Sequence, residues 1–592
     1  MTIVIVFGII STIKKGMVFD TGGNHYMKVN PNQTKYDYML ENSKNHMNSI
    51  ALTFEDKKIT YEEMFEAIDK YAKLLRSKGV EKGDLIGICT FNTPEAVYLV
   101  YALNLLGAVV VGYSPFDTKE RIKADVELTK PKMVITTDYS YGSFKDLEKS
   151  LNISTILYSP LDSSKNWKLK IGYNLLQLKN GNYTLSRDKR LKHLLKMNFD
   201  RITLPNVPYY EGELSDIMFT GGSTGIHKGV DLNDIGLNSE IEGMKLLYDE
   251  NFFDGKIYLG QIPFGHMAFG RSILHAALTN NMTYALTLKA MPDDFYGELV
   301  RTQAHGASGG PPHWTSLIEM KNGVYVPRSD LKPNTLNNLQ VAFSGGEAKK
   351  EATEGAINEA LLYCGSQTKL GDGLGATETW GSNILNTGNY FKEGMLGVAI
   401  PNLQIKLINP ETGEPVQKGE RGLLYISGPS VMMGYHNNPE ETSKVLSYDE
   451  DGTKWLNLGD YLREEDDGFY KYVGRQKRNF VCGCDNIYPE QLEELLQTLP
   501  EVREAVVTPI SDGLLQFIPS YHISLYSDQI DIESFEDRMK KMITTNTCEN
   551  ALPRKIEYTT EPLVRMMNSK VDVEYYRKKD VESEGKTLTL KK

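Results

Sequence analysis

Residues 216–230 read DIMFTGGSTGIHKGV, and this stretch decides how the rest of the chain is interpreted. Residues 217–219 are apolar and predict a short buried strand. The glycines that follow can adopt positive φ and leave their N–H groups pointing at an anion. Hydroxyl groups and a lysine add donors and a positive charge. The sequence therefore predicts a phosphate-binding loop made of Thr220, Gly221, Gly222, Ser223, Thr224, Gly225 and Lys228.

This loop is not the common P-loop, because that motif needs Gly, four residues and then Gly-Lys-Ser/Thr. Here Lys228 follows His227 and precedes Gly229, so the register differs. An ordinary surface loop rich in Gly, Ser and Thr is the alternative at this point. The motifs further along the chain distinguish the two interpretations.

Length, composition and charge limit the class of protein. A chain of 592 residues is too long for one core and should form two or more domains. Its 40% apolar and 24% charged residues are typical of a globular protein. The net charge of −11 argues against nucleic acid as a partner. Five cysteines argue against a disulfide framework and favour a reducing, cytoplasmic location.

Two apolar stretches resemble targeting or membrane segments. Residues 3–10 are apolar, but the lysines follow this run, which is the wrong side for a secretory signal. We expect residues 1–34 to form an extension, and leave open whether residues 1–16 belong to the natural protein. Residues 96–113 are interrupted by Asn104 and Gly107, which favours a buried helix and strand over a membrane span.

The first part of the chain alternates between helices and strands. Thr60 and Glu63 form a capping box that starts a helix ending at Gly79. A second helix is predicted over 94–106, and strands over 85–89, 108–113, 133–137 and 155–158. This alternation indicates a mainly parallel sheet with helices on its faces. Segment 160–210 is polar and weakly periodic, which predicts a loose connection to the phosphate-binding loop.

Further site candidates lie in motifs that follow the phosphate-binding loop in the sequence. A strand over 341–344 ends in Ser-Gly-Gly, and residues 371–375 read GDGLG. That second run mimics a dinucleotide fingerprint, but no clear βαβ unit surrounds it, so we reject this interpretation. Near the C-terminus we predict a helix starting near 489, strands over 505–507, 515–518 and 521–524, and a helix over 531–542. The remaining site candidates are His266, Ser344, Gly345, Gly346, Glu347, Gly373, Leu374, Gly375, Thr377, Glu378, Asp460, Arg475, Lys477 and Lys570.

In their order and spacing these motifs resemble those of the adenylate-forming enzymes, which include acyl-CoA synthetases, peptide-synthetase adenylation domains and beetle luciferases. The resemblance covers roughly residues 35–580. It implies an α/β fold with a large N-terminal domain over 35–475, built of mainly parallel, helix-flanked sheets and a small β-layer. A small, mobile α+β domain over 476–592 follows, with Lys477 as the hinge. His227 and Leu374 stand where the family usually has proline and an aromatic residue.

The resemblance also implies a role for each candidate residue. The loop 220–228 would hold the ATP phosphates, Glu378 and Thr224 the Mg²⁺ ion, and Lys570 the carboxylate and α-phosphate. Asp460 and Arg475 would bind the ribose. The segments of Gly345–Glu347 and Gly373–Thr377 would approach the adenine and α-phosphate. His266, Ser344, Gly345 and Gly373 would line the pocket for the acid.

The implied reaction is ATP-dependent activation of a small carboxylic acid to acyl-AMP, followed by transfer to a pantetheine thiol. CoA is the leading acceptor, and the alternative is an acyl carrier protein acting in trans, because no carrier domain follows in the chain. A luciferase-like oxygenase and a non-catalytic nucleotide-binding regulator are further alternatives. Residues 263–270 contain no aspartate to pair a substrate ammonium, which argues against an α-amino acid.

Overall fold

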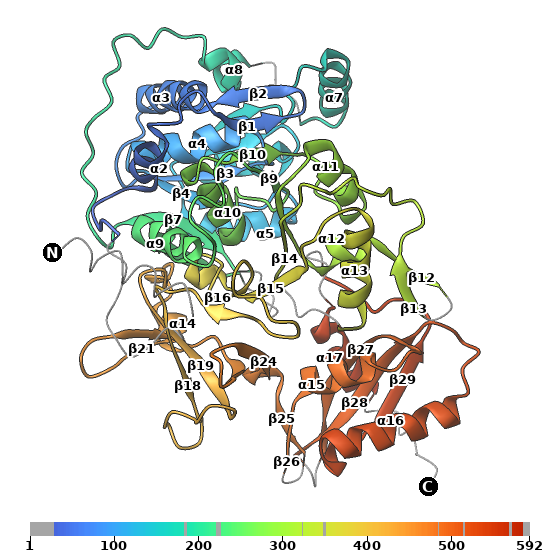
Figure 1. Cartoon of the computed structure of the whole chain (residues 1–592). Coiled ribbons are helices and arrows are strands. Elements are labelled where there is room, and N and C mark those ends of the chain that lie inside the picture. Colours follow the sequence, from blue (N-terminus) through green and yellow to red (C-terminus); the bar gives the residue numbers. More distant parts are fainter. Residues whose placement is uncertain are drawn as a thin grey trace, which may run out of the picture.

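The computed structural model describes residues 29–182, 186–220, 227–321, 324–346, 351–482, 485–512, 516–566 and 571–583. Figure 1 shows a large body that contains the N-terminal and central parts of the chain, and a smaller C-terminal unit at the lower right. The predicted α/β fold class is confirmed. Among the described residues, no helix combines the length and the apolar character needed to cross a bilayer.

The first sheet contains the strand that leads into the phosphate-binding loop. Its strand order is β20-β8-β7-β4-β3-β5-β6, and β3 to β7 are parallel, whereas β8 and β20 are antiparallel additions. The strands are β3 (Leu85–Cys89), β4 (Val109–Gly112), β5 (Met133–Thr137), β6 (Ser154–Tyr158), β7 (Leu214–Phe219), β8 (Gly229–Asn233) and β20 (Gly434–Tyr435).

Two helices beside this sheet form where the sequence predicts them. Thr60 and Glu63 make both bonds of the capping box that starts α3 (Tyr61–Ser77). The Thr93 hydroxyl caps α4 (Pro94–Leu105), and Gly107 ends it with φ of 68°. Residues 94–104 of α4 are all buried, which explains their mainly apolar character without a membrane. The other helices of this part are α2 (Lys35–Ser43), α5 (Lys119–Thr129), α6 (Tyr141–Ser150), α7 (Trp167–Lys179) and α8 (Leu191–Leu194).

The second sheet shares a core with the first through α3, α4 and α10 (Ala268–Thr279). Its order is β17-β16-β15-β14-β11-β9-β10-β1-β2, and its central strands are parallel. The strands are β1 (Ile50–Phe54), β2 (Lys57–Thr60), β9 (Ile257–Gly260), β10 (Thr283–Leu286), β11 (Gly306–Gly309), β14 (Val341–Ser344), β15 (Leu370–Leu374), β16 (Ile384–Asn386) and β17 (Val398–Ala399). The helices α9 (Asp234–Lys245), α11 (Phe295–Thr302), α12 (Pro311–Thr315) and α13 (Glu351–Tyr363), and the hairpin β12 (Ile318–Lys321) and β13 (Val324–Pro327), complete this part.

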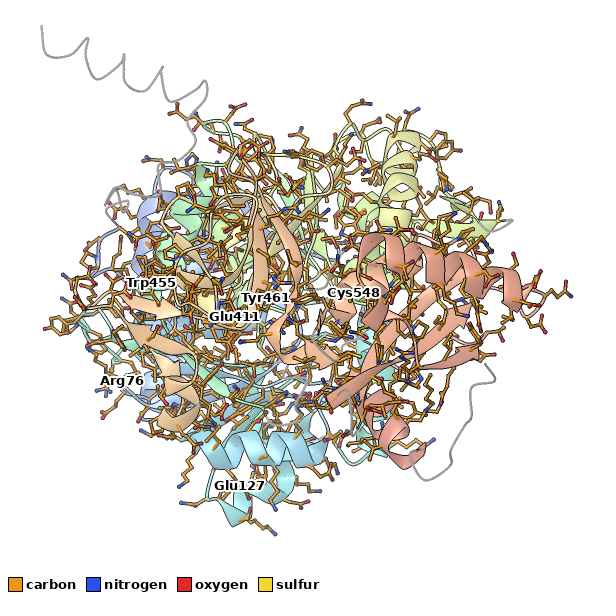
Figure 2. All side chains as sticks on the ribbon, turned by 90° about the horizontal axis from the view of Figure 1, so that it is seen from below. Arg76, Glu127, Glu411, Trp455, Tyr461 and Cys548 are labelled. Atoms are coloured by element: carbon orange, nitrogen blue, oxygen red, sulfur yellow. The ribbon has the colours of Figure 1, made fainter. Side chains whose placement is uncertain are left out.

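A third, antiparallel sheet is the small β-layer that the glycine-punctuated sequence predicts. Its order is β21-β22-β19-β23-β24, with β18 paired to β19. Figure 2 shows Trp455 and Tyr461 on this layer, beside the C-terminal unit that carries Cys548. The elements are β18 (Gln404–Ile408), β19 (Arg421–Ser427), α14 (Pro439–Ser443), β21 (Leu446–Tyr448), β22 (Lys454–Leu456), β23 (Asp460–Glu464) and β24 (Tyr470–Arg475).

The C-terminal unit is an α+β structure with its own core. The sheet order is β26-β25-β28-β27, and β29 pairs with β28. Its elements are β25 (Phe480–Cys482), β26 (Asp485–Ile487), α15 (Pro489–Gln497), β27 (Val502–Asp512), β28 (Gln516–Leu525), α16 (Ile532–Asn546), β29 (Lys555–Thr559) and α17 (Val573–Ser583). The domain boundary at 475/476 remains a prediction.

Three predictions about local structure are wrong. Segment 160–210 contains the 13-residue helix α7 rather than a loose connection. The two strands expected over 515–518 and 521–524 form one strand, β28, because Pro519 lies opposite Pro509 and neither needs an N–H donor there. A βαβ unit, β14-α13-β15, does end in the GDGLG run. That run lies on its second strand and no helix starts there, so the rejection of a dinucleotide fingerprint still holds.

A buried ion cluster joins the elements around β7. The Asp216 carboxylate binds Lys35 Nζ at 2.6 Å and Arg271 Nη1 at 2.7 Å, and all three side chains are inaccessible to solvent. Lys35 Nζ also lies 2.8 Å from Asp234 Oδ1, whose other oxygen accepts from Asn104 at 2.6 Å. Burial alone would raise the pKa of Asp216, but Lys35 and Arg271 lower it below its ordinary value.

We expect Asp216→Asn to lower the free energy of unfolding by about 3–5 kcal/mol, because it leaves buried cations with less compensation. Asp467→Asn is the matched control: its pair with Lys392 is exposed, so the loss should stay below about 1 kcal/mol. Since the pKa of Asp216 is lowered on folding, its contribution is present above about pH 4 and lost as the pH falls through the folded value. Urea denaturation measures both variants, and equal losses would contradict a structural role for the cluster.

Candidate functional site

The predicted phosphate-binding loop connects β7 to β8 as an antiparallel hairpin. Phe219 pairs with Gly229, and the Thr220 N–H donates to the Lys228 carbonyl at 3.0 Å. Both ends of the loop are therefore fixed by the sheet. Some predicted site residues lie outside the described residues: Gly221, Gly222, Ser223, Thr224, Gly225, Glu347 and Lys570.

The structure brings Lys228 and Glu378 together through Tyr435. Lys228 Nζ lies 4.2 Å from the centre of the Tyr435 ring and 3.2 Å from Glu441 Oε2. The Tyr435 hydroxyl donates to Glu378 Oε1 at 2.7 Å. Burial, and next the neighbouring Glu378, raise the pKa of Tyr435, so its hydroxyl stays protonated and can donate.

Neither Tyr435 nor Glu441 was among the site residues predicted from the sequence. The pairing of β20 with β8 puts Tyr435 opposite Val230, two residues after Lys228. This strand pair joins residues about two hundred positions apart, so no local pattern in the sequence could reveal it. Tyr435 is thus a neighbour of the predicted site as well as a core residue.

Asp460 and Arg475, the predicted ribose-binding residues, are paired with each other. Asp460 is the first residue of β23 and Arg475 the last of β24, and the two lie directly opposite in the ladder. Arg475 Nε donates to Asp460 Oδ1 at 2.7 Å. The pKa of Arg475 is raised, mainly by the neighbouring Asp460 carboxylate and less by Tyr472 and Glu378.

The glycines after β14 and on β15 permit close backbone approach. Gly346 has φ of 87°, and the Gly345 N–H donates to the Gly309 carbonyl at 3.2 Å. A Cβ at Gly373 would lie 2.6 Å from the Ile384 carbonyl oxygen. The hydroxyl of Ser344, which is fully buried, has no hydrogen-bond partner among the described residues. Leu374, at the family's aromatic position, packs instead against the core below the small β-layer.

Trp380 fixes the turn that carries Thr377 and Glu378. This turn, Thr377–Thr379, is a single 3₁₀ turn, and Trp380 leaves it in the left-handed region with φ of 63°. The Trp380 indole N–H donates to the Asn233 carbonyl at 3.0 Å, at the end of β8. The turn is thereby tied to the strand that follows the phosphate-binding loop. Trp380 was not identified from the sequence.

An apolar pocket lies between α9, α10 and the second sheet. It encloses about 640 Å³ of empty space, including open solvent at its mouth. Side chains that shape it include Tyr248, Tyr258, Phe269, Ile273, Phe343 and Leu385. The lining contains no carboxylate, and Lys245 is its one cation among the described residues.

His266, predicted to wall the acid pocket, is placed in the turn before α10 and does not line this apolar pocket. Burial, and next Arg271, lower the pKa of His266 to about 4, so the ring is neutral at pH 7. Its buried Nδ1 has no partner among the described residues. Ser344, Gly345 and Gly373 also do not line the pocket, whereas Phe343, next to Ser344, and Phe269, at the start of α10 after His266, do. Their predicted roles stay predictions.

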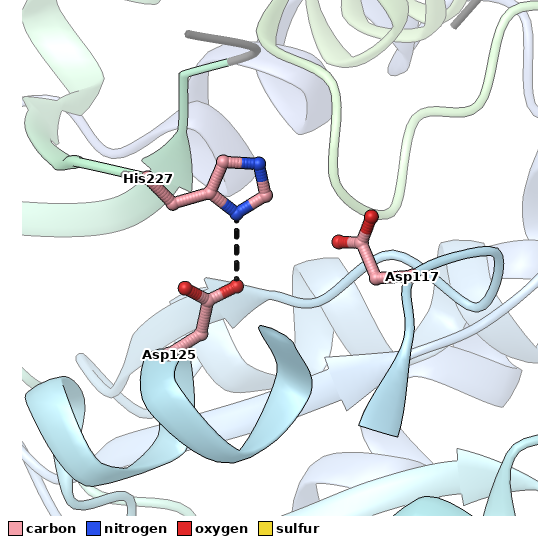
Figure 3. A group of neighbouring side chains, drawn as sticks. All are labelled: Asp117, Asp125 and His227. Atoms are coloured by element: carbon pink, nitrogen blue, oxygen red, sulfur yellow. Dashed lines mark hydrogen bonds and ion pairs between the residues drawn. The ribbon is translucent and has the colours of Figure 1, made fainter. Parts of the chain in front are cut away.

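His227 connects the exit of the phosphate-binding loop to α5. Its Nδ1 accepts from Arg121 Nε at 2.9 Å and lies 3.2 Å from Asp125 Oδ2, and Asp117 completes the cluster (Figure 3). The side chains of Asp117, Asp125 and His227 lie close enough together to act as ligands of one metal ion. However, the Arg121 N–H occupies the nitrogen lone pair that an ion would need. We interpret the cluster as a tether that holds the loop exit, where the resembling family usually has proline.

Lys477, the predicted hinge, lies in the 3₁₀ turn Gln476–Arg478 between β24 and β25. The Gln476 N–H donates to the Gly459 carbonyl at 2.7 Å, which holds the start of this turn against the small β-layer. The position joins the antiparallel layer to the C-terminal unit. Whether rotation occurs there stays a prediction.

Comparison with known proteins gives consistent similarities. Residues 39–436 match the family model described as AMP-binding enzyme. The chain is 27% identical over 476 residues to a probable 4-coumarate–CoA ligase 2 of Dictyostelium discoideum, which covers 79% of this chain and 81% of that relative. It is 24% identical to a long-chain-fatty-acid–CoA ligase of Bacillus subtilis (strain 168), over 82% of this chain and 84% of the relative.

The fold is also similar to a solved structure. The anthranilate CoA ligase AuaEII in complex with anthranoyl-AMP has a TM-score of 0.75 at 18% identity, and the match covers 94% of this chain and 99% of that one. At this identity, the likeness concerns the fold alone.

Gly375 tests whether the turn around Glu378 depends on close backbone contact. A Cβ at this position would lie 1.6 Å from the Gly381 carbonyl oxygen. We expect Gly375→Ala to shift the turn and to lower the free energy of unfolding by about 1–3 kcal/mol. Gly297→Ala is the control: that glycine lies within α11 in open space, so alanine should stabilise by roughly 0.5–1 kcal/mol. Equal unfolding curves for the two variants would refute the packing argument.

Proposed function

The chain belongs to the AMP-binding enzyme family, and from this premise we propose that it is an AMP-forming acid:CoA ligase. The substrate carboxylate attacks the α-phosphate of ATP, giving acyl-AMP and pyrophosphate. The CoA thiol then attacks the acyl carbonyl carbon, and AMP leaves as the thioester forms. The observation that carries the proposal is the link that Tyr435 makes between Lys228, at the exit of the β7–β8 hairpin, and Glu378. Asp460 and Arg475, which pair with each other, are the further residues of the proposed site.

In the first step negative charge develops on the phosphates, so fixed positive groups should contribute most of the stabilisation. Lys228 is held between Tyr435 and Glu441, and we assign it to the phosphates of ATP. Arg475, fixed by Asp460, is assigned with it to the ribose side of the nucleotide. Lys570 is assigned to the carboxylate and α-phosphate, and Lys477 to the domain rotation, both on the family resemblance.

Glu378 fits a Mg²⁺ ion. Tyr435 donates to Oε1, which leaves Oε2 without a protein donor among the described residues. A carboxylate oxygen is a ligand that Mg²⁺ accepts. Thr224 is assigned to the same ion on the resemblance alone. When bound, the ion would offset the phosphate charge.

We assign the substrate acid to the apolar pocket, because Phe343, which lines it, directly precedes the predicted acid-pocket residue Ser344. This assignment favours an apolar monocarboxylic acid, aliphatic or aromatic. The described residues of the lining include no carboxylate to pair a substrate ammonium, so an α-amino acid would bury an uncompensated charge. A second carboxylate on the acid would meet mostly aromatic and aliphatic side chains. Apolar acids gain from displacement of water along these walls.

Pyrophosphate release from ATP, measured with a panel of acids, tests both the activity and the substrate class. We expect release with aliphatic or cinnamate-like acids, and little with α-amino acids or malonate. Thioester formation with CoA supports the ligase, whereas acyl-AMP that accumulates with CoA and reacts only with carrier-protein phosphopantetheine would assign the carrier alternative. If no acid promotes pyrophosphate release, the chain is a nucleotide-binding protein and the proposal is wrong.

Tyr435→Phe tests the positioning of Glu378. The variant keeps the ring beside Lys228 and removes the hydroxyl that donates a hydrogen bond to Glu378. We expect kcat/KM for ATP to fall by roughly 10- to 100-fold, with a higher Mg²⁺ concentration needed for half-maximal rate. Tyr448→Phe, on the exposed strand β21, should leave both quantities unchanged. A lowered rate with an unaltered Mg²⁺ dependence would argue that Tyr435 acts through packing instead.

A further inference from the structure

The helix α7 turns its apolar side chains toward solvent. Trp167 is 64% exposed, Leu175 61% and Ile171 51%. The other apolar side chains that are about half exposed on this helix are Leu169, Leu176 and Leu178. In Figure 1, α7 stands at the upper right edge of the large body, on the side away from the C-terminal unit. A concentration of this kind on one short helix is unusual for a surface that meets only water.

The opposite face of α7, which meets the protein, is polar. At 100° per residue, Lys170, Tyr173, Asn174 and Gln177 fall on one side. Lys170 Nζ donates to the Asp162 carbonyl at 3.0 Å, and Gln177 is buried. The Asn174 side-chain oxygen is buried without a partner among the described residues, and the buried Tyr173 hydroxyl lies beside the Tyr139 backbone. The helix is therefore inverted with respect to an ordinary surface helix, which buries its apolar stripe.

Positive charge accompanies the apolar face. Residues 165–179 contain four lysines and no acidic residue, in a chain whose net charge is −11. Lys168 and Lys179 project on the exposed side, between the apolar side chains, and Lys165 precedes the helix. Tryptophan, leucine and lysine on one helix face are the combination that lies at the boundary between lipid headgroups and acyl chains.

We propose that α7 binds the surface of an anionic lipid membrane. The apolar side chains would enter the acyl boundary while the lysines meet anionic headgroups. With 13 residues the helix is roughly 20 Å long, so it would lie on the membrane and not cross it. A second copy of the chain fits less well, because a two-fold interface would place the same lysines against each other. An apolar acid that partitions into lipid would be within reach of an enzyme held there.

Co-sedimentation of the full chain with vesicles tests this proposal. The vesicles are phosphatidylcholine alone or phosphatidylcholine with phosphatidylglycerol. We expect binding to the anionic vesicles, much less binding to the neutral ones, and release as salt screens the lysines. Lys168→Glu with Lys179→Glu should weaken binding by at least about fivefold, and Trp167→Ser with Ile171→Ser should do so comparably.

Matched controls use exposed residues elsewhere. Tyr448→Ser replaces an aromatic side chain that is 66% exposed, and Lys149→Glu with Lys541→Glu repeats the charge change on other helices. These variants should bind as the wild type does. All variants should unfold like the wild type, since the replaced side chains face solvent.

Absence of wild-type binding to anionic vesicles at low salt would overturn the proposal. So would α7 variants that bind as tightly as the controls. Light scattering that shows a dimer abolished by the α7 variants, without vesicle binding, would assign the face to a second copy. The salt dependence of the wild-type chain needs no variant, so the test holds even if a substitution impairs folding.

Discussion

The contact between Asp216, Lys35 and Arg271 determines where the phosphate-binding loop begins. Asp216 lies on β7, and its two cations come from α2 and α10, so one carboxylate fixes three elements that are distant in sequence. Replacement of buried ion pairs by apolar residues is often neutral or stabilising, so their value lies in specificity. Here any slip of β7 would bury an unpaired cation. The strand end, three residues further on, is held in one position by that penalty.

A second constraint brings the residues proposed for nucleotide binding together from separate sheets. Tyr435 extends the first sheet through β20, and Asp460 and Arg475 face each other on the antiparallel layer. Glu378 comes from the turn between β15 and β16 of the second sheet, and its backbone carbonyl accepts from the Met432 N–H at 2.8 Å. The site therefore depends on how three sheets meet, and not on any one loop. Its residues also hold one another in pairs, which lowers the entropy cost of binding a highly charged ligand.

Many helices and strands could be predicted because they depend on residues that are close together in the sequence. The capping box at Thr60 and the Thr93-Pro94 start fixed two helices, and alternation of helices with apolar strands fixed the sheet type. The family motifs identified the candidate site residues along the chain. Contacts between distant segments could not be predicted: Tyr435 with Glu378, Trp380 with Asn233, and His227 with Asp125. Each joins residues that no helical or strand periodicity relates.

The helix α7 in segment 160–210 was not predicted, because its apolar side chains do not face the protein. Periodicity predicts a surface helix when one face is apolar and buried, yet α7 buries its polar face and exposes the apolar one. In water such a helix gains little: the Asn174 side-chain oxygen loses hydration without a partner among the described residues, and the outer face displaces no solvent. A helix of this length is marginal without tertiary support. The outer face of α7 becomes stabilising only when another surface covers it, so its sequence is best understood as adapted to that second surface.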